Sequence, residues 1–172
     1  MSKEIPLKSD DIEALSKAIG SLIIAWSLIE SILDIWQTII NKFPKTNIEM
    51  GEMGRLNKYK IKFIRENISK IDDLSSYNDI IIDLLNDIEL ILKTRNTISH
   101  CYPSGLRVSD STVIFRSLEL VEKKTSHRVK DRSMHINKIC KDAILSQEIY
   151  GKMLKITNEI LDKFFPDYKI ID

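Results

Sequence analysis

Residues 12–40 read IEALSKAIGSLIIAWSLIESILDIWQTII, and this stretch decides the fold. Its large apolar residues recur at alternating spacings of three and four, which keeps them on one stripe of an α-helix. A second apolar row runs beside the first, so a single packing partner cannot cover the helix. We expect a long helix from Ser9 to about Phe43, either central or at a subunit interface, followed by a loop over residues 45–54.

The helical period returns in three later segments of the chain. Residues 56–68 form a short amphipathic pattern with a basic polar side. A longer pattern begins near Asn78 and must end by Tyr102, because Pro103 disfavours further helix. Residues 133–165 form a fourth pattern, whose three-and-four spacing includes Gln147 and Tyr150. We therefore expect four main helices, of which the first and last are the longest.

The segment between the third and fourth patterns changes period. Residues 107–117, RVSDSTVIFRS, are rich in β-branched residues on either side of Asp110 and Ser111. This pattern predicts a small hairpin, with a third strand over residues 125–132 left open. The predicted class is all-α, a helical bundle of four main helices with a small β-hairpin inserted at about residues 105–132.

Length and composition indicate an ordinary soluble globule. The chain has 172 residues, of which 43% are hydrophobic and 30% charged, and this fits a single domain over residues 1–172. Two cysteines and an N-terminus without a signal-peptide pattern favour the cytoplasm and no disulfide. Glu30 and Asp34 interrupt the most apolar stretch, and charges at a bilayer centre are costly, so we expect no membrane span.

The charged residues are unevenly distributed along the chain. The formal net charge of +1 gives no global attraction to a polyanion, but residues 55–70 hold six basic residues and one acid. Such runs are usually solvated helix faces. Lys58, Lys62 and Arg65 in this run are nevertheless candidates for binding RNA phosphates, as is Lys93 on the third helix.

The end of the third predicted helix concentrates residues suited to phosphate chemistry. Lys93, Asn96 and His100 project from one side of a helix, whereas Arg95 points about 100° away from Asn96. Arginine has planar donors that fit two phosphate oxygens, and histidine transfers protons near neutral pH. A structural interpretation stays open, in which Arg95 pairs with an acid such as Glu30 and His100 merely stabilises the helix end.

At this point the sequence resembles a known family. Residues 95–100, RNTISH, are similar to the R-x4-6-H signature of HEPN ribonucleases, and Tyr102 extends the match to R-x4-H-x-Y. The resemblance covers the motif closely and residues 9–165 loosely, by helix order. It implies a HEPN-like bundle, a homodimer whose two motifs line one cleft, and a role in prokaryotic toxin–antitoxin or abortive-infection defence.

The resemblance also bears on regulation. In toxins with the R-x4-H-x-Y form the tyrosine can be modified by a nucleotidyltransferase antitoxin, which makes Tyr102 a candidate regulatory residue and such an antitoxin a candidate partner. The hairpin between the third and fourth helices is a departure, because many compact toxins lack it.

The expected activity is metal-independent cleavage of RNA. His100 would act as general base on a ribose 2′-hydroxyl, and Arg95 would stabilise charge on the phosphate. Asn96 would hold the phosphate or fix His100, and Glu30 is a candidate for orienting Arg95. The sequence offers no group of residues at metal-ligand spacing, so we expect neither a metal nor a cofactor, and products with 2′,3′-cyclic phosphate and 5′-hydroxyl ends.

Two other functions remain open at this point. One is a catalytically silent HEPN-like dimer that binds a nucleotide or a partner protein, with Arg95 and His100 in structural roles. The other is a plain helical interaction module. An open cleft where Arg95 and His100 of two subunits converge would favour the ribonuclease over both.

Overall fold

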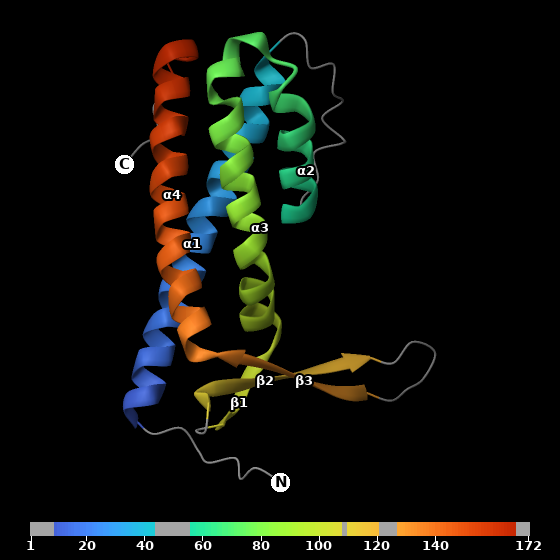
Figure 1. The fold of residues 1–172 in the computed structure, drawn as a ribbon. Coiled ribbons are helices and arrows are strands. Elements are labelled where there is room, and N and C mark those ends of the chain that lie inside the picture. The colour runs from blue at the N-terminus through green and yellow to red at the C-terminus, as the bar shows by residue number, and fades with distance from the viewer. Residues whose placement is uncertain (1–8, 44–55, 108–109, 121–126, 168–172) are drawn as a thin grey trace. The chain divides into compact units, whose positions relative to one another are not determined.

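The computed structural model describes residues 9–43, 56–107, 110–120 and 127–167. Within these residues the chain forms four α-helices and three strands (Figure 1). The helices are α1 (Ser9–Lys42), α2 (Asn57–Ile68), α3 (Asn78–His100) and α4 (Ile136–Phe164), and a short 3-10 helix, η2 (Asp72–Tyr77), precedes α3. The strands are β1 (Tyr102–Arg107), β2 (Thr112–Leu120) and β3 (His127–His135). The loop predicted over residues 45–54 lies outside the described residues.

The predicted all-α class is wrong. The three strands form an antiparallel sheet in the order β1-β2-β3, so the chain is mainly helical with a sheet between α3 and α4. The sheet runs from Tyr102 to His135, beyond the predicted insertion at residues 105–132. Residues 133–135, predicted to begin the fourth helix, belong to β3, because their backbone pairs with β2.

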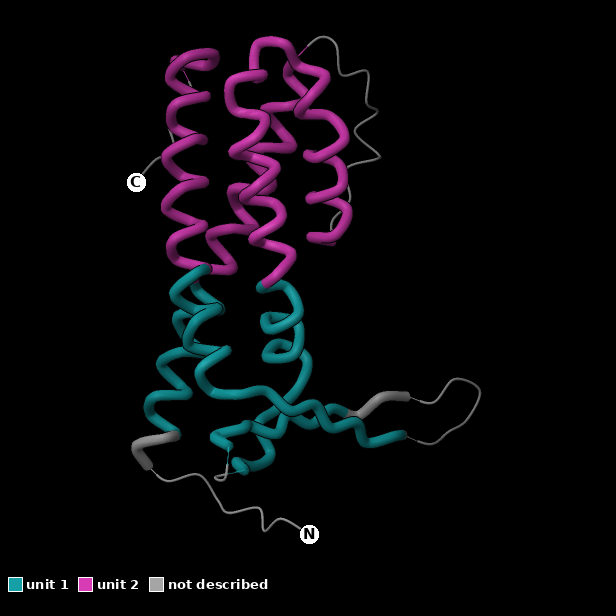
Figure 2. The backbone as a smooth tube through the Cα atoms, viewed as in Figure 1, with its two compact units in different colours: residues 1–24, 91–145 teal, residues 25–90, 146–172 magenta. Residues whose placement is uncertain are grey.

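The described chain separates into two compact units (Figure 2). Unit 1 consists of residues 1–24 and 91–145, and unit 2 consists of residues 25–90 and 146–172. Helices α1, α3 and α4 each contribute a segment to both units. The single domain expected from the sequence stays a prediction.

Unit 2 has a core formed by helices. The α1 residues predicted to form its first apolar stripe are buried there: Trp26, Ile29, Leu33, Trp36 and Ile40. The indole Nε1 of Trp36 donates a 2.8 Å hydrogen bond to Thr157 Oγ1, which joins α1 to α4 inside this core. By length and composition alone α1 also resembles a membrane helix, a test that core helices of soluble proteins pass as well. The expected absence of a membrane span and the cytoplasmic location therefore stay predictions.

Unit 1 has an apolar core of its own beneath the sheet. Its buried residues come from α1, β1, β2 and α4: Leu15, Leu106, Val113, Phe115 and Ile139. Ile98 of α3 and Cys101, which directly follows that helix, pack against this cluster. The core therefore fixes the C-terminal end of α3, where the predicted motif lies, against the sheet.

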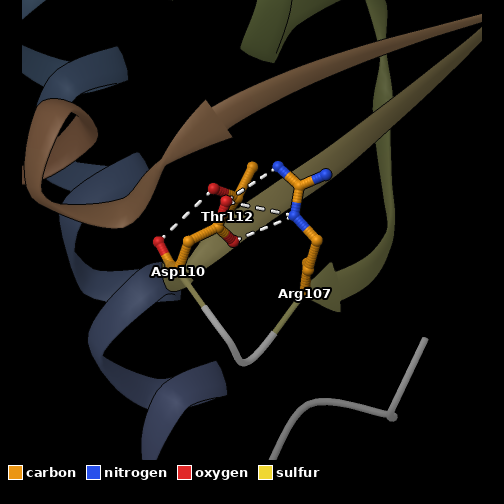
Figure 3. A network of polar contacts seen from close by, with 3 residues as sticks. All are labelled: Arg107, Asp110 and Thr112. Atoms are coloured by element: carbon orange, nitrogen blue, oxygen red, sulfur yellow. Dashed lines mark hydrogen bonds and ion pairs between the residues drawn. The ribbon is translucent and has the colours of Figure 1, made fainter. Parts of the chain in front are cut away.

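The turn between β1 and β2 is held by a polar network (Figure 3). Arg107 donates from Nε and Nη2 to the carboxylate of Asp110 at 2.8 to 3.1 Å, and Thr112 Oγ1 donates to the backbone carbonyl of Asp110 at 3.4 Å. The hydrogen bond from Arg107 lowers the pKa of Asp110 below its usual value, and it raises the pKa of Arg107. Ser111, in the same turn, has a positive φ of 49°.

Strand β3 passes directly into α4. The strand ends at His135 and the helix begins at Ile136, with no residue between them. The Ile136 amide donates to the Ser111 carbonyl at 2.9 Å, and the Asn137 amide donates to His135 Nδ1 at 3.1 Å. The β1–β2 turn and the last residue of β3 therefore supply acceptors for amides in the first turn of α4, which have no acceptor within the helix.

The buried face of α4 differs from the predicted stripe. Gln147 is exposed and Tyr150 is only half-buried, whereas Ile149, Met153 and Ile156 are buried. The helical period is correct in this segment, but the predicted stripe has the wrong angular phase. The face buried in this part of the helix lies about one residue earlier in the chain than the predicted stripe.

Candidate functional site

The candidate site lies at the C-terminal end of α3, in unit 1. Arg95 and Asn96 lie in the last two turns of the helix, and His100 is its final residue. Arg95 and Asn96 are half-buried and His100 is exposed. The structure thus places all three predicted catalytic residues at one helix end, as their spacing indicates.

Packing of the opposite face turns two of these residues outward. Ile98 lies against the apolar core of unit 1. Asn96 and His100, two residues before and after it, each project about 160° away from Ile98 around the helix. They are therefore one turn apart on the outer face of α3, with their Cβ atoms about 5 to 6 Å apart.

The guanidinium of Arg95 is held beside Asn96 by a hydrogen bond. Its Nη1 donates a hydrogen bond to Asn96 Oδ1 at 3.1 Å, although the two Cα–Cβ directions differ by about 100°. Asn96 therefore orients the guanidinium, a role that the sequence pattern did not indicate. A guanidinium oriented by Asn96, at the same helix end as an exposed imidazole, is a suitable set of groups for binding and transforming a phosphodiester.

His100 is the most accessible residue of this group. Within the described part of the chain its side chain makes no hydrogen bond or ion pair. An exposed imidazole with this freedom can accept a proton from a bound substrate. The Cys101 amide, directly after the helix, donates to the Thr97 carbonyl at 3.0 Å, which holds the backbone at this helix end.

A buried hydrogen bond joins α3 to α4 one residue before Arg95. Thr94 Oγ1 donates to Asp142 Oδ2 at 2.5 Å, and both residues are buried. Lys138 Nζ approaches the same carboxylate oxygen at 2.8 Å. The charge of Asp142 is therefore compensated, and the backbone that carries Arg95 is fixed to α4. Sequence reasoning missed this pair, and its only signal was a threonine on the buried side of α3.

Tyr102 lies outside the helix, as the first residue of β1. Its side chain is exposed, and its backbone position pairs in register with Arg116 of β2. An exposed tyrosine two residues after His100 is accessible to a modifying enzyme. Whether it is modified stays a prediction.

The predicted RNA-binding lysines and arginine are divided between the two units. Lys93 is exposed on α3 in unit 1, whereas Lys58, Lys62 and Arg65 lie on α2 in unit 2. Lys62 Nζ is 3.7 Å from Glu66 Oε1, and Arg65 Nη2 is 2.9 Å from Glu89 Oε2. Part of the positive charge of α2 is therefore neutralised locally, and a shared RNA surface with the motif stays a prediction.

Glu30, the predicted partner of Arg95, lies on α1 in unit 2. Its Oε1 accepts a hydrogen bond from Asn57 Nδ2 at the start of α2. Glu30 thus has a role in connecting α1 to α2. Its predicted role in orienting Arg95 would require a contact between the two units and stays a prediction.

Among the described side chains, no three histidine, cysteine, aspartate or glutamate residues lie together in a group that could hold a metal ion. Cys101 and Cys140, the two cysteines, are both unbridged and half-buried. The expectation that the activity needs neither a metal nor a cofactor stays a prediction that must be tested in solution.

No protein-family model matches the chain, and no solved structure matches it. The similarity to HEPN ribonucleases therefore depends on the residues of the motif and on their position at the end of α3.

Proposed function

We propose that this chain is a metal-independent endoribonuclease of the HEPN type, acting in prokaryotic defence or as the toxin of a toxin–antitoxin pair. One observation carries the proposal. Arg95, Asn96 and His100 lie together at the end of α3, with the guanidinium oriented by Asn96 and the imidazole exposed.

The proposed reaction uses the substrate's own nucleophile. The His100 imidazole takes the proton of a ribose 2′-hydroxyl, and that oxygen attacks the adjacent phosphorus. A P–O2′ bond forms while the P–O5′ bond breaks, and the leaving 5′-oxygen receives a proton from the same ring or from its counterpart in a second subunit. Arg95 donates to the phosphate oxygens on which negative charge accumulates.

The half-buried position of Arg95 supports this assignment. A guanidinium that is partly shielded from water interacts more strongly with a phosphate than one in bulk solvent. Its hydrogen bond to Asn96 restricts its orientation before the substrate binds, which lowers the entropic cost of ordering it. The arrangement favours stabilisation of the transition state over loose attraction to RNA.

A homodimer is part of the proposal. Two apolar residues one turn apart on α1 are exposed, Ile24 by 66% and Leu28 by 39%. A second copy of the chain would cover such a row and remove apolar surface from water. The second subunit would bring its own His100 and Arg95 to the substrate, as the resemblance implies.

End-labelled RNA incubated with the purified protein in EDTA tests the chemistry. Cleavage should proceed without a metal and leave 2′,3′-cyclic phosphate and 5′-hydroxyl ends, whereas a matched oligodeoxynucleotide should remain intact. Cleavage that requires magnesium, or that proceeds equally on the deoxy substrate, contradicts the mechanism. If the wild type cuts no RNA, a silent dimer becomes the better interpretation.

Matched histidine variants test the residue assignment. His100→Ala should lower the cleavage rate by about 100-fold or more, the usual contribution of a general base. The control is His135→Asn, which removes another exposed imidazole and retains a side chain able to cap α4. Both variants should melt within a few degrees of the wild type. Normal cleavage by His100→Ala would show that this histidine is structural.

Growth assays test the proposed biological setting. Expression should arrest growth, and co-expression of a cognate nucleotidyltransferase should relieve the arrest. Tyr102→Phe removes the hydroxyl that would be modified, so this variant should stay toxic in the presence of that partner. Rescue of the phenylalanine variant would exclude Tyr102 as the modified residue.

A further inference from the structure

The β2–β3 ribbon has a face that the proposed chemistry does not use. The two strands pair antiparallel from Thr112 opposite His135 to Leu120 opposite His127, and β3 is an edge strand of the sheet (Figure 1). Successive side chains of a strand point to opposite faces. Arg128, Lys130 and Arg132 therefore project from one face of β3, which we call the basic face.

The basic face is strongly charged and open to solvent. All three of its β3 residues are exposed. Directly opposite on β2, Ser117 pairs in register with Lys130 and Glu119 with Arg128. The three β3 residues place three basic side chains on this face, in a chain whose net charge is only +1.

The other face of the same ribbon is electrostatically balanced. Arg116 and Asp131 pair in register and form a two-pronged ion pair, with Nε to Oδ1 at 2.8 Å and Nη2 to Oδ2 at 2.9 Å. Charged residues commonly protect an edge strand from aggregation, and such protection works from either face. The basic residues of β3 instead lie together on one face, a segregation that edge protection does not require.

The basic face lies on the same side of the sheet as the candidate site. Val113 and Phe115 of β2 point into the apolar core of unit 1, and Phe115 pairs in register with Arg132. Residues directly opposite in an antiparallel pair share a face. The basic face therefore continues the helix-covered face of the sheet, and Ile98 of α3 packs on that same core.

We propose that the basic face of the β2–β3 ribbon binds the phosphate backbone of the RNA substrate, outside the cleavage site. Alternate residues of a strand are about 6.6 Å apart, which is close to the spacing of successive phosphates in an extended single strand. Two of the three residues are arginines, which contact phosphate through two donors at once. Binding here would be independent of base sequence and sensitive to salt.

This inference rests on the proposed ribonuclease activity for its substrate, but binding can be measured without cleavage. The probe is a short fluorescein-labelled 2′-O-methyl RNA, which lacks the nucleophilic hydroxyl, and the readout is fluorescence anisotropy. The variant is Arg128→Gln, Lys130→Gln and Arg132→Gln combined. Its control removes the same charge from exposed positions of α4: Lys141→Gln, Lys152→Gln and Lys155→Gln.

The ribbon variant should bind the probe at least 10-fold more weakly than the wild type at moderate salt. The slope of log K against log salt should fall by about 2, since each phosphate contact on a single strand contributes about 0.7. Arg128→Gln alone should reduce the slope by about a third of that amount. The α4 control should retain affinity within about threefold. Equal losses in both triple variants, or none in the ribbon variant, overturn the proposal.

Cleavage assays separate this inference from the proposed function. With cleavable RNA, the ribbon variant should show a raised KM and a kcat close to the wild type. Ribbon-dependent binding by a wild type that cuts nothing would refute the ribonuclease and leave the binding face standing. Cleavage by the ribbon variant with an unchanged KM would overturn the binding face and leave the proposed ribonuclease standing. Ribbon-dependent binding to anionic lipid vesicles without any to RNA would replace the nucleic acid by a membrane and overturn the proposal.

Discussion

Replacing Thr94 with valine should lower the free energy of unfolding by about 2 kcal/mol. Valine has nearly the same shape as threonine, so the substitution creates no cavity and removes mainly the hydrogen bond to Asp142. A hydrogen bond to a charged group contributes about 1.5 to 3 kcal/mol. Both residues are buried, so water cannot readily replace the lost donor. Lys138 still approaches the carboxylate, which keeps the expected loss within this range.

Urea unfolding followed by circular dichroism measures this loss. The control is Thr38→Val on α1, where an exposed threonine hydroxyl donates to the Asp34 carbonyl, and its effect should stay within about 0.5 kcal/mol. A double-mutant cycle with Asp142→Ala should give a coupling energy of at least 1 kcal/mol. A Thr94→Val loss below about 0.5 kcal/mol, or effects that simply add, would refute the idea that this bond fixes the motif-bearing end of α3.

Three further predictions concern the turn, the sheet and the assembly. Ser111→Gly should raise the free energy of unfolding by up to about 1 kcal/mol, because glycine adopts a positive φ without steric cost; a lower melting temperature would contradict this. Hydrogen bonds from arginines lower the pKa of Asp110 and of Asp131. Their ion pairs therefore stabilise the sheet fully at a pH above the ordinary carboxyl pKa of 3.8, and this stabilisation is lost as the pH falls through the lowered pKa values. NMR amide exchange in the sheet should therefore accelerate only in strong acid, and acceleration between pH 7 and 5 would argue against these pairs. Light scattering at micromolar concentration should give twice the 19.9 kDa chain mass, and a monomer would contradict the composite site.

Helix positions could be predicted from periodicity, but the buried face of α4 could not. The predicted bounds of α1 and α3 are confirmed, because a strong three-and-four pattern allows few alternatives. In α4 apolar residues occur at several angular phases, so more than one stripe is compatible with the sequence. The helices that pack against α4 select Ile149, Met153 and Ile156, and that choice depends on contacts distant in sequence.

The sheet was only partly predictable. The β-branched residues of β2 indicate a strand, whereas β3 reads HRVKDRSMH and has no apolar alternation. Its strand conformation results from pairing with β2, which local propensity does not report. Strand β1 contains Pro103, a residue that disfavours strands, and the register shifts between Pro103 and Gly105 at an edge of the sheet, where proline is tolerated.

The site was predictable in position and not in detail. The spacing of Asn96 and His100 places them on one helix face, because helical geometry alone fixes that relation. The hydrogen bond from Arg95 to Asn96 depends on side-chain rotamers, which a sequence does not specify. The partner of Thr94 lies 48 residues away in the chain, and only the packing of α4 beside α3 within unit 1 brings it near.

The direct passage from β3 into α4 makes the junction intolerant of added residues. A strand alternates its side chains every residue, whereas a helix turns by about 100° per residue. One residue inserted between His135 and Ile136 would therefore rotate all of α4 by about 100° with respect to the strand before it. Asp142 would leave the side of the helix that faces Thr94, and Ile139 would leave the core. Length variation in this region should be confined to the connection between β2 and β3. An added residue there changes neither the alternation of side chains along β3 nor the rotation of α4 relative to that strand.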